Sequence, residues 1–139
     1  MSVSKTYAEL KIGDRACVTR TITPEMVNKF AEVSGDYNPV HLDAEYAKTT
    51  RFGRPIAHGM LCIGLLSALF GTQLPGEAIY IKHLITFKKP VFVGETVTAW
   101  VEIVRKTDDR KRIFEARAWV ENQAGEVLVD GEATLMTAA

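Results

Sequence analysis

The chain has 139 residues, of which 47% are hydrophobic and 24% are charged, a balance typical of a globular protein with an apolar core. Seventeen basic and seventeen acidic residues give a formal net charge of zero, so no basic excess favours nucleic acid or a charged membrane surface as a partner. The length predicts one domain over residues 1–139. A first strand is expected over Asp14 to Ile22, after a turn at Gly13.

The next element in the chain is a predicted helix. Thr23 has the position of an N-cap, Pro24 that of the first helical residue, and Gly35 that of the C-cap. A second helix is expected to begin near residues 57–59 and to end near Phe70. It is apolar nearly all round, which predicts a helix buried on every side.

After residue 77, apolar and polar residues alternate between turn signals, which predicts four strands over 78–87, 95–104, 112–121 and 127–136. These strands are most simply arranged as an antiparallel meander. In the first of them, the alternation places five side chains on the inner face: Ile79, Ile81, His83, Ile85 and Phe87. The expected fold class is therefore α+β, with an antiparallel five-stranded sheet wrapped around the long apolar helix.

Cys17 and Cys62 are too few for a disulfide framework and lack metal-site spacing, so we expect two buried free thiols in a reducing compartment. The N-terminal residues show no apolar segment typical of a signal peptide, and the longest apolar run, 60–70, is too short to span a bilayer. A cytoplasmic protein that binds no membrane is the expectation.

The densest polar cluster lies at residues 34–43. Asp36 and His41 are five residues apart, and Pro39 between them forbids a continuous helix, so the segment can fold back and bring a carboxylate and an imidazole to one ligand. Such a pair suits general acid–base chemistry on water. The same residue types also form ordinary surface turns, and the cluster alone leaves both interpretations open.

Gly59 is expected at the start of the apolar helix, where an unpaired main-chain N–H and the positive end of the helix dipole could stabilise an oxyanion. Alternatively, Gly59 is only a small residue that lets the helix approach the sheet. Four potential metal ligands, His41, Asp43, His58 and His83, lack the spacing of known metal motifs, so neither a metal nor another cofactor is expected.

The segments SGDYNPVH at 34–41 and RPIAHGM at 54–60, with Ala47 between them, resemble the motif of the R-specific enoyl-CoA hydratases, the MaoC-like dehydratases. The resemblance extends to QLPG at 73–76 and FKKPVFVG at 87–94, and so covers nearly the whole chain. It implies a hot-dog fold and a homodimer with the acyl chain near the subunit interface. It also implies reversible syn hydration of trans-2-enoyl-CoA to (R)-3-hydroxyacyl-CoA, of the kind that supplies polyhydroxyalkanoate synthesis.

Residue by residue, the resemblance makes Asp36 and His41 the acid–base pair that holds the water, without deciding which is acid and which is base. It makes the Gly59 N–H the group that polarises the thioester carbonyl. It assigns four further residues to substrate binding and gives the first of them the additional role of fixing the catalytic loop: Asn38, Ser67, His58 and Met60. Surface cations, with Arg51, Lys88 and Lys89 as candidates, would contact the CoA phosphates.

Two other functions are open to the same fold. An acyl-CoA thioesterase would carry a carboxylate on the buried helix, but residues 57–72 contain neither Asp nor Glu. A non-catalytic acyl-binding protein would have lost one member of the pair, but Asp36 and His41 are both present. The residue pattern does not distinguish a CoA thioester from an acyl-carrier-protein thioester, nor does it show the length of the acyl chain.

Overall fold

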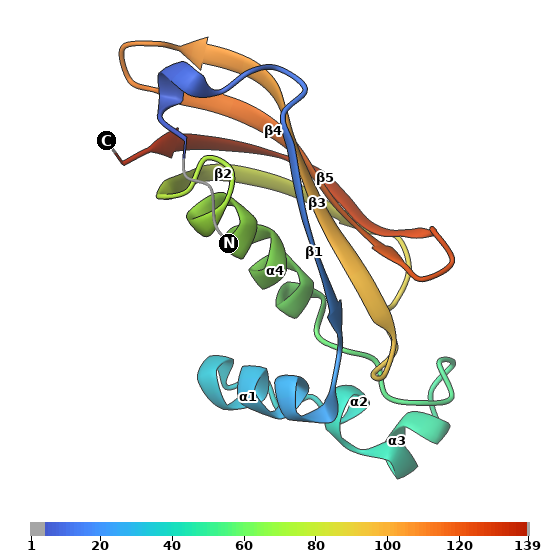
Figure 1. Cartoon of the computed structure of the whole chain (residues 1–139). Coiled ribbons are helices and arrows are strands. Elements are labelled where there is room, and N and C mark those ends of the chain that lie inside the picture. The colour runs from blue at the N-terminus through green and yellow to red at the C-terminus, as the bar shows by residue number, and fades with distance from the viewer. Residues whose placement is uncertain (1–4, 139) are drawn as a thin grey trace.

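The computed structural model describes residues 5–138, in which a curved sheet lies against one long helix (Figure 1). The elements in chain order are a short 3-10 helix (Tyr7–Glu9), β1 (Arg15–Thr21), α1 (Pro24–Ser34), α2 (Pro39–Leu42), α3 (Ala44–Lys48), α4 (Gly59–Thr72), β2 (Ala78–Phe87), β3 (Thr96–Asp108), β4 (Ile113–Asn122) and β5 (Val127–Thr137). α4 lies along the concave side of the sheet, and α1, α2 and α3 lie together beyond one end of it. Among the described residues, no helix combines the length and apolarity needed to cross a membrane.

The five strands form one antiparallel sheet in the order β1-β3-β4-β5-β2, which confirms the predicted fold class. β3, β4 and β5 form the expected meander. The expectation that β2 starts this meander is wrong, because β2 pairs with β5 at one edge and β1 pairs with β3 at the other. The chain crosses from β2 to β3 through residues 88–95, and this crossing lets the sheet curve around α4 from both sides.

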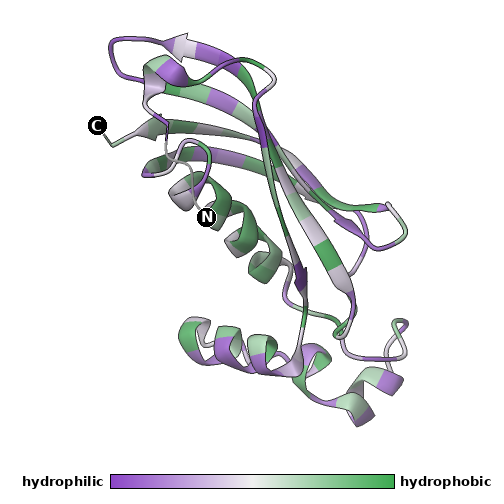
Figure 2. Ribbon diagram, viewed as in Figure 1, coloured by the Kyte–Doolittle hydropathy of each residue, from purple (hydrophilic) through white to green (hydrophobic). Residues whose placement is uncertain are grey.

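The core lies between α4 and the inner face of the sheet. In β3 and β4 the inner residues are the ones that the alternating pattern places on one face, each with no exposed area: Val97, Ala99, Val101, Ile103, Phe114, Ala116, Ala118 and Val120. Several of them are alanines, which let the helix approach the sheet closely. Figure 2 shows α4 as hydrophobic along most of its length, whereas α1 also carries hydrophilic residues. Each large apolar side chain buried here contributes roughly 1.5–3 kcal/mol.

The alternation in β2 is interrupted by a β-bulge. The register with β5 shifts between Tyr80 and Lys82, so Ile81 is an extra residue in the strand. Before the bulge Tyr80 faces inward and after it His83 does, whereas Ile79 and Ile81 are 50% and 51% exposed. The prediction that these two isoleucines face the core is therefore wrong, because the extra residue reverses the alternation.

α4 begins at Gly59, within the predicted range, but it is not buried on every side. Residues at helical spacing form one exposed face: Met60, Gly64, Ser67, Ala68 and Gly71. This correction places Ser67 on the surface of the single chain rather than inside the core.

The two cysteines also differ. Cys62 on α4 is buried, and burial raises the pKa of its thiol to about 12. Cys17 is exposed, against the expectation of two buried thiols, because Ala16 and Val18 take the inward positions of β1. The outer side of β1 is otherwise polar, and Thr19 and Thr21 bond to threonines of β3 at 2.9 Å.

Candidate active site

The end of α1 determines where Asp36 lies. Thr23 caps the start of this helix by accepting the Met26 N–H at 3.2 Å, as predicted. Gly35 adopts a left-handed conformation with φ of 78°, which ends the helix and turns the chain. Asp36 follows directly, exposed, at the start of the segment that contains His41.

Side chains in this segment organise its main chain. The Asp36 carboxylate accepts the Asn38 N–H at 3.2 Å, and the Asn38 side-chain oxygen accepts the Val40 N–H at 3.0 Å. With Pro39 as its first residue, α2 is a single short helix that carries His41. The predicted role of Asn38 in fixing this loop is therefore visible in its contacts. α2 and α3 themselves were not predicted, although the caps Asn38 and Asp43 are signals that could have shown them.

A main-chain carbonyl fixes the tautomer of His41. Its Nδ1 lies 2.6 Å from the Ile56 oxygen, which can only accept, so Nδ1 carries the hydrogen and Nε2 keeps its lone pair. Burial lowers the pKa of His41, while the bond to Ile56 and the charge of Asp36 oppose this shift and His58 adds to it. The imidazole is therefore held neutral, with Nε2 able to accept a proton.

His58 lies behind this pair, at the N-cap of α4, and is 2% exposed. Its Nε2 donates to the Asp36 main-chain oxygen at 2.9 Å, and its ring centroid lies 3.9 Å from that of His41 and 4.7 Å from that of Phe30. Its Nδ1 has no hydrogen-bond partner within the described part of the chain. These contacts make His58 a positioning residue for the loop, a role that the sequence analysis did not identify.

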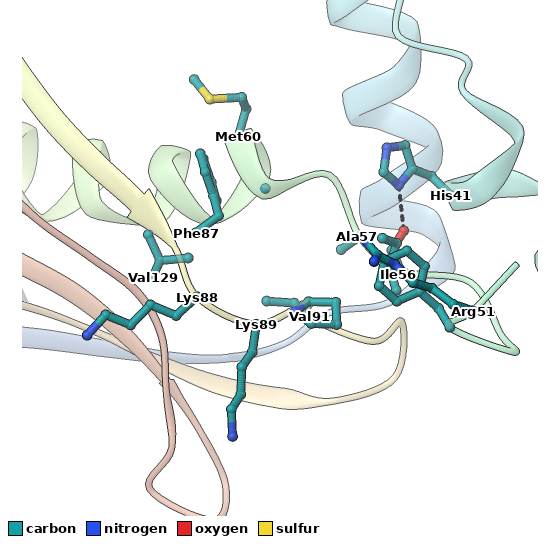
Figure 3. A pocket seen from close by; sticks show the side chains of 13 residues that line it. His41, Arg51, Ile56, Ala57, Met60, Phe87, Lys88, Lys89, Val91 and Val129 are labelled. Carbon is teal, nitrogen blue, oxygen red and sulfur yellow. Dashed lines mark hydrogen bonds between the residues drawn. The ribbon is translucent and has the colours of Figure 1, made fainter.

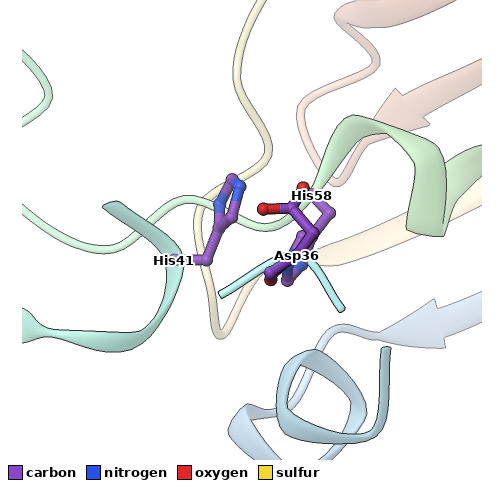
Figure 4. A group of neighbouring side chains, drawn as sticks. All are labelled: Asp36, His41 and His58. Atoms are coloured by element: carbon purple, nitrogen blue, oxygen red, sulfur yellow. Dashed lines mark hydrogen bonds between the residues drawn. The ribbon is translucent and has the colours of Figure 1, made fainter. Parts of the chain in front are cut away.

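Asp36, His41 and His58 offer ligand atoms within 4.8 Å of one another, close enough to ask whether they fit a metal ion (Figure 4). One nitrogen of each ring is already bonded to a main-chain oxygen. The two rings are tilted by 34°, with their centroids 3.9 Å apart. Such second hydrogen bonds are compatible with proton transfer and also with metal binding, so a cofactor-free site stays a prediction.

His41 borders a cavity of about 500 Å³ (Figure 3). The cavity is lined by the region around His41, the start of α4, the end of β2 with the segment after it, and β5: His41, Arg51, Phe52, Ile56, Ala57, Gly59, Met60, Phe87, Lys88, Lys89, Pro90, Val91 and Val129. His41 and Arg51 lie on one side, and Met60, Phe87 and Val129 lie on the other. Of the predicted site residues, His41, Gly59 and Met60 line this cavity, and Asp36 lies beside His41 without lining it.

Gly59 is the first residue of α4, so its N–H has no partner inside the helix and sits at the positive end of the dipole. The ring of Phe87 lies only 2.5 Å from the point that a Cβ on Gly59 would occupy. A side chain at position 59 would therefore require the Phe87 ring to move. This contact leaves the N–H of Gly59 beside the cavity.

Ser67 lies away from the cavity in the single chain. It lies eight residues beyond Gly59 on α4, which is about 12 Å along the helix. Ser67 and Met60 share the exposed face of α4, so both are available to a second chain.

The three candidate cations lie at the cavity. Lys89 forms an ion pair with Glu126, the Lys88 ammonium lies 3.9 Å from an Asp130 oxygen, and Arg51 lies over the ring of Phe52. All three residues are exposed, so the mouth of the cavity carries positive charges whose present partners a ligand can replace.

Residues 11–124 match the family model described as "MaoC like domain". The (R)-specific enoyl-CoA hydratase of Rhodospirillum rubrum is 42% identical over 135 residues, covering 96% of this chain and 92% of that protein. The enzyme of the same name from Aeromonas caviae is 43% identical, covering 91% and 94%.

Solved structures agree with these sequence relatives. The (R)-hydratase from Aeromonas caviae involved in PHA biosynthesis superposes with a TM-score of 0.89 at 42% identity, covering 93% of this chain and 98% of that one. The sheet order and the enclosed helix therefore form the hot-dog fold that the sequence resemblance implied. Because the family model matches most of the chain and the relatives align over nearly their full length, the chain belongs to the MaoC-like dehydratase family.

Proposed function

We propose that this protein is an (R)-specific enoyl-CoA hydratase that adds water reversibly to trans-2-enoyl-CoA and yields (R)-3-hydroxyacyl-CoA. The observation that carries the proposal is a neutral His41, with the Asp36 carboxylate beside it, at a cavity that is also lined by the glycine at the start of α4. The names of the relatives from Rhodospirillum rubrum and Aeromonas caviae support it. By analogy with the Aeromonas caviae structure, the product would supply polyhydroxyalkanoate synthesis.

The arrangement supplies each part of the reaction. A water molecule held by Asp36 and His41 gives its proton to Nε2 of His41 while its oxygen bonds to C3 of the substrate. The electron pair of the double bond moves onto the thioester, and the Gly59 N–H stabilises the resulting enolate oxygen. C2 then takes a proton from the Asp36–His41 pair on the same face, so that one water is added overall. The negative charge of Asp36 favours the imidazolium that forms on the way.

The cations at the cavity mouth support a CoA thioester as the substrate. Arg51, Lys88 and Lys89 surround the opening beyond the reacting groups, where the phosphates of CoA would lie if the acyl chain enters between α4 and the sheet. The cavity wall on the other side, with Met60, Phe87 and Val129, is apolar and suits the acyl chain.

We also propose that two copies of the chain pair through the free edge of β2. Exposed apolar side chains gather on this edge strand: Ile79, Ile81, Leu84 and Phe87. An unpaired edge with such side chains is a template for another strand. Pairing two β2 edges would bring the exposed face of α4, with Ser67, close to the second chain, which agrees with an acyl site near a subunit interface.

The hydration is tested with purified protein and crotonyl-CoA by following the loss of the enoyl-thioester absorbance, with the product assigned by R-specific and S-specific dehydrogenases. We expect rapid loss of absorbance and R product. Asp36→Asn and His41→Gln should each lower kcat by about 10²- to 10⁴-fold with an unchanged circular dichroism spectrum. Glu45→Gln, which changes an exposed acidic residue on α3, serves as the matched control and should keep full activity.

The same assay separates the proposal from its alternatives. Treatment with EDTA should leave the rate unchanged, whereas a loss restored by added metal would show that Asp36, His41 and His58 hold an ion. Release of free CoA from saturated acyl-CoA would identify a thioesterase. A folded protein that binds crotonyl-CoA without turnover would be an acyl-binding protein, and the hydratase proposal would then be wrong.

A further inference from the structure

Two buried polar side chains on β2 lie outside the machinery described so far. The Tyr80 hydroxyl and both ring nitrogens of His83 are buried, and none of them has a hydrogen-bond partner among the residues described. The two rings stack on each other, with centroids 5.3 Å apart and 19° between their planes. Buried hydrogen-bonding groups are almost always satisfied by protein, water or a ligand, so this pair requires a partner from outside the protein.

The pair faces the interior, next to α4. In the sheet register Tyr80 lies opposite Leu135 and His83 lies opposite Ala133, two residues with 0% and 1% exposure. The ring of Tyr80 meets that of Phe70 on α4 edge-on at 5.7 Å. Burial lowers the pKa of His83 and raises that of Tyr80 to about 12, so both groups are neutral at ordinary pH. Each can then donate one hydrogen bond and also accept one.

Two contacts show that β2 runs antiparallel alongside α4. Phe87 lies against Gly59 at the catalytic end of the helix, and Tyr80 lies against Phe70 near its other end. His83 lies four residues from Phe87, about 13 Å along the strand. An acyl chain that starts at Gly59 and follows the seam between α4 and β2 therefore meets His83 first and then Tyr80.

We propose that Tyr80 and His83 form a hydrogen-bonding site for water at the inner end of the path that the acyl chain follows between α4 and β2. This site selects short acyl chains. The inference rests on the proposed function, because that function places the thioester at Gly59. A short chain ends before the pair and leaves its water in place. A longer chain brings apolar carbon against three polar atoms and displaces their partner without replacing its hydrogen bonds.

The test compares kcat/KM for trans-2-butenoyl-, hexenoyl- and octenoyl-CoA in the wild type, Tyr80→Phe, His83→Leu and the double variant. Tyr80→Phe removes only a hydroxyl group, and His83→Leu replaces the polar ring with an apolar side chain of similar size. Neither substitution therefore opens much new space. We expect the octenoyl-to-butenoyl ratio to rise by about tenfold in the double variant, with butenoyl turnover within about twofold of wild type. Thr86→Ser, a small change on the outer face of the same strand, is the matched control and should leave this ratio unchanged.

Binding of butanoyl- and octanoyl-CoA, which have no double bond to hydrate, gives a second readout by calorimetry. A ratio of binding constants that moves toward the longer chain in both variants supports the proposal even if no hydration is found, in which case only the proposed function fails. If the variants fold and bind but neither ratio changes by more than about twofold, Tyr80 and His83 do not select chain length and the proposal is wrong.

Discussion

At the scale of single residues, the chemistry of His41 is set by its surroundings rather than by its type. The Ile56 carbonyl holds the hydrogen on Nδ1, and His58 stacks against the ring from behind. His58 also holds the Asp36 main chain, so one buried side chain positions both members of the acid–base pair. The two side chains that we propose as catalytic thereby keep their relative positions, although Asp36 itself is exposed.

The pH dependence of hydration should follow the protonation of His41. Burial disfavours the imidazolium, so the pKa of His41 lies below that of an unperturbed histidine. As the pH falls, activity should therefore be lost only below the ordinary pKa of histidine. The charge of Asp36 raises the pKa, so Asp36→Asn should lower it further. Titration of the ring resonances by NMR measures both values. An unchanged or higher pKa in Asp36→Asn would show that the two side chains do not interact in solution.

Much of the site could be predicted from single residues, and some could not. The spacing of Asp36, Pro39 and His41 indicates a folded-back segment, and the structure brings the carboxylate and the imidazole together. The role of the Ile56 carbonyl could not be predicted from the sequence, because every residue has a main-chain carbonyl. The position of His58 depends on the packing of α1 against α4, which a local pattern does not contain.

At the scale of elements, the start of α4 depends on the contact between Gly59 and Phe87. Gly59→Ala would place a Cβ about where the Phe87 ring lies, so the ring must turn away or the helix N-terminus must shift. We expect kcat/KM to fall by about 10²-fold, measured with crotonyl-CoA, because the N–H that stabilises the enolate moves. Phe87→Leu in the same chain should restore part of this loss.

Gly71→Ala is the control, since a Cβ there meets nothing within 4 Å and the residue lies in the last turn of α4. It should keep wild-type activity and match or exceed wild-type thermal stability, because alanine favours a helix over glycine. Equal losses in Gly59→Ala and Gly71→Ala would point to a general effect on the helix and not to the N–H of Gly59.

The elements also show which features of the fold a local sequence pattern can predict. Alternation identified the four strands after residue 77 and the inner faces of β3 and β4, because each side chain in β3 and β4 follows the pleat. It failed in β2, where one extra residue at Ile81 reverses the faces. It also failed on the order of β2 and β3, since strand pairing is decided by how the whole sheet surrounds α4. Long-range pairing is not encoded in any single segment.

At the scale of the whole molecule, the free edge of β2 predicts a dimer. Light scattering should give about twice the mass of one chain. Leu84→Lys places a charge on a side chain that is 74% exposed in the single chain, and it should shift the protein toward monomer and lower activity. Val33→Lys changes a residue that is 85% exposed on α1 and should remain dimeric. A monomeric wild type with full activity would show that one chain is sufficient.

The opposite edge of the sheet has a different character, and this asymmetry limits how the protein assembles. The outer residues of β1 are polar or charged: Arg15 pairs with Glu102, and Thr19 and Thr21 bond to their neighbours on β3. In the proposed dimer, two β2 strands pair across a two-fold axis, so the apolar edge of each chain is covered. The two β1 edges that remain are unsuited to further strand addition. In this proposed dimer, growth of the sheet into a filament is therefore blocked after one step.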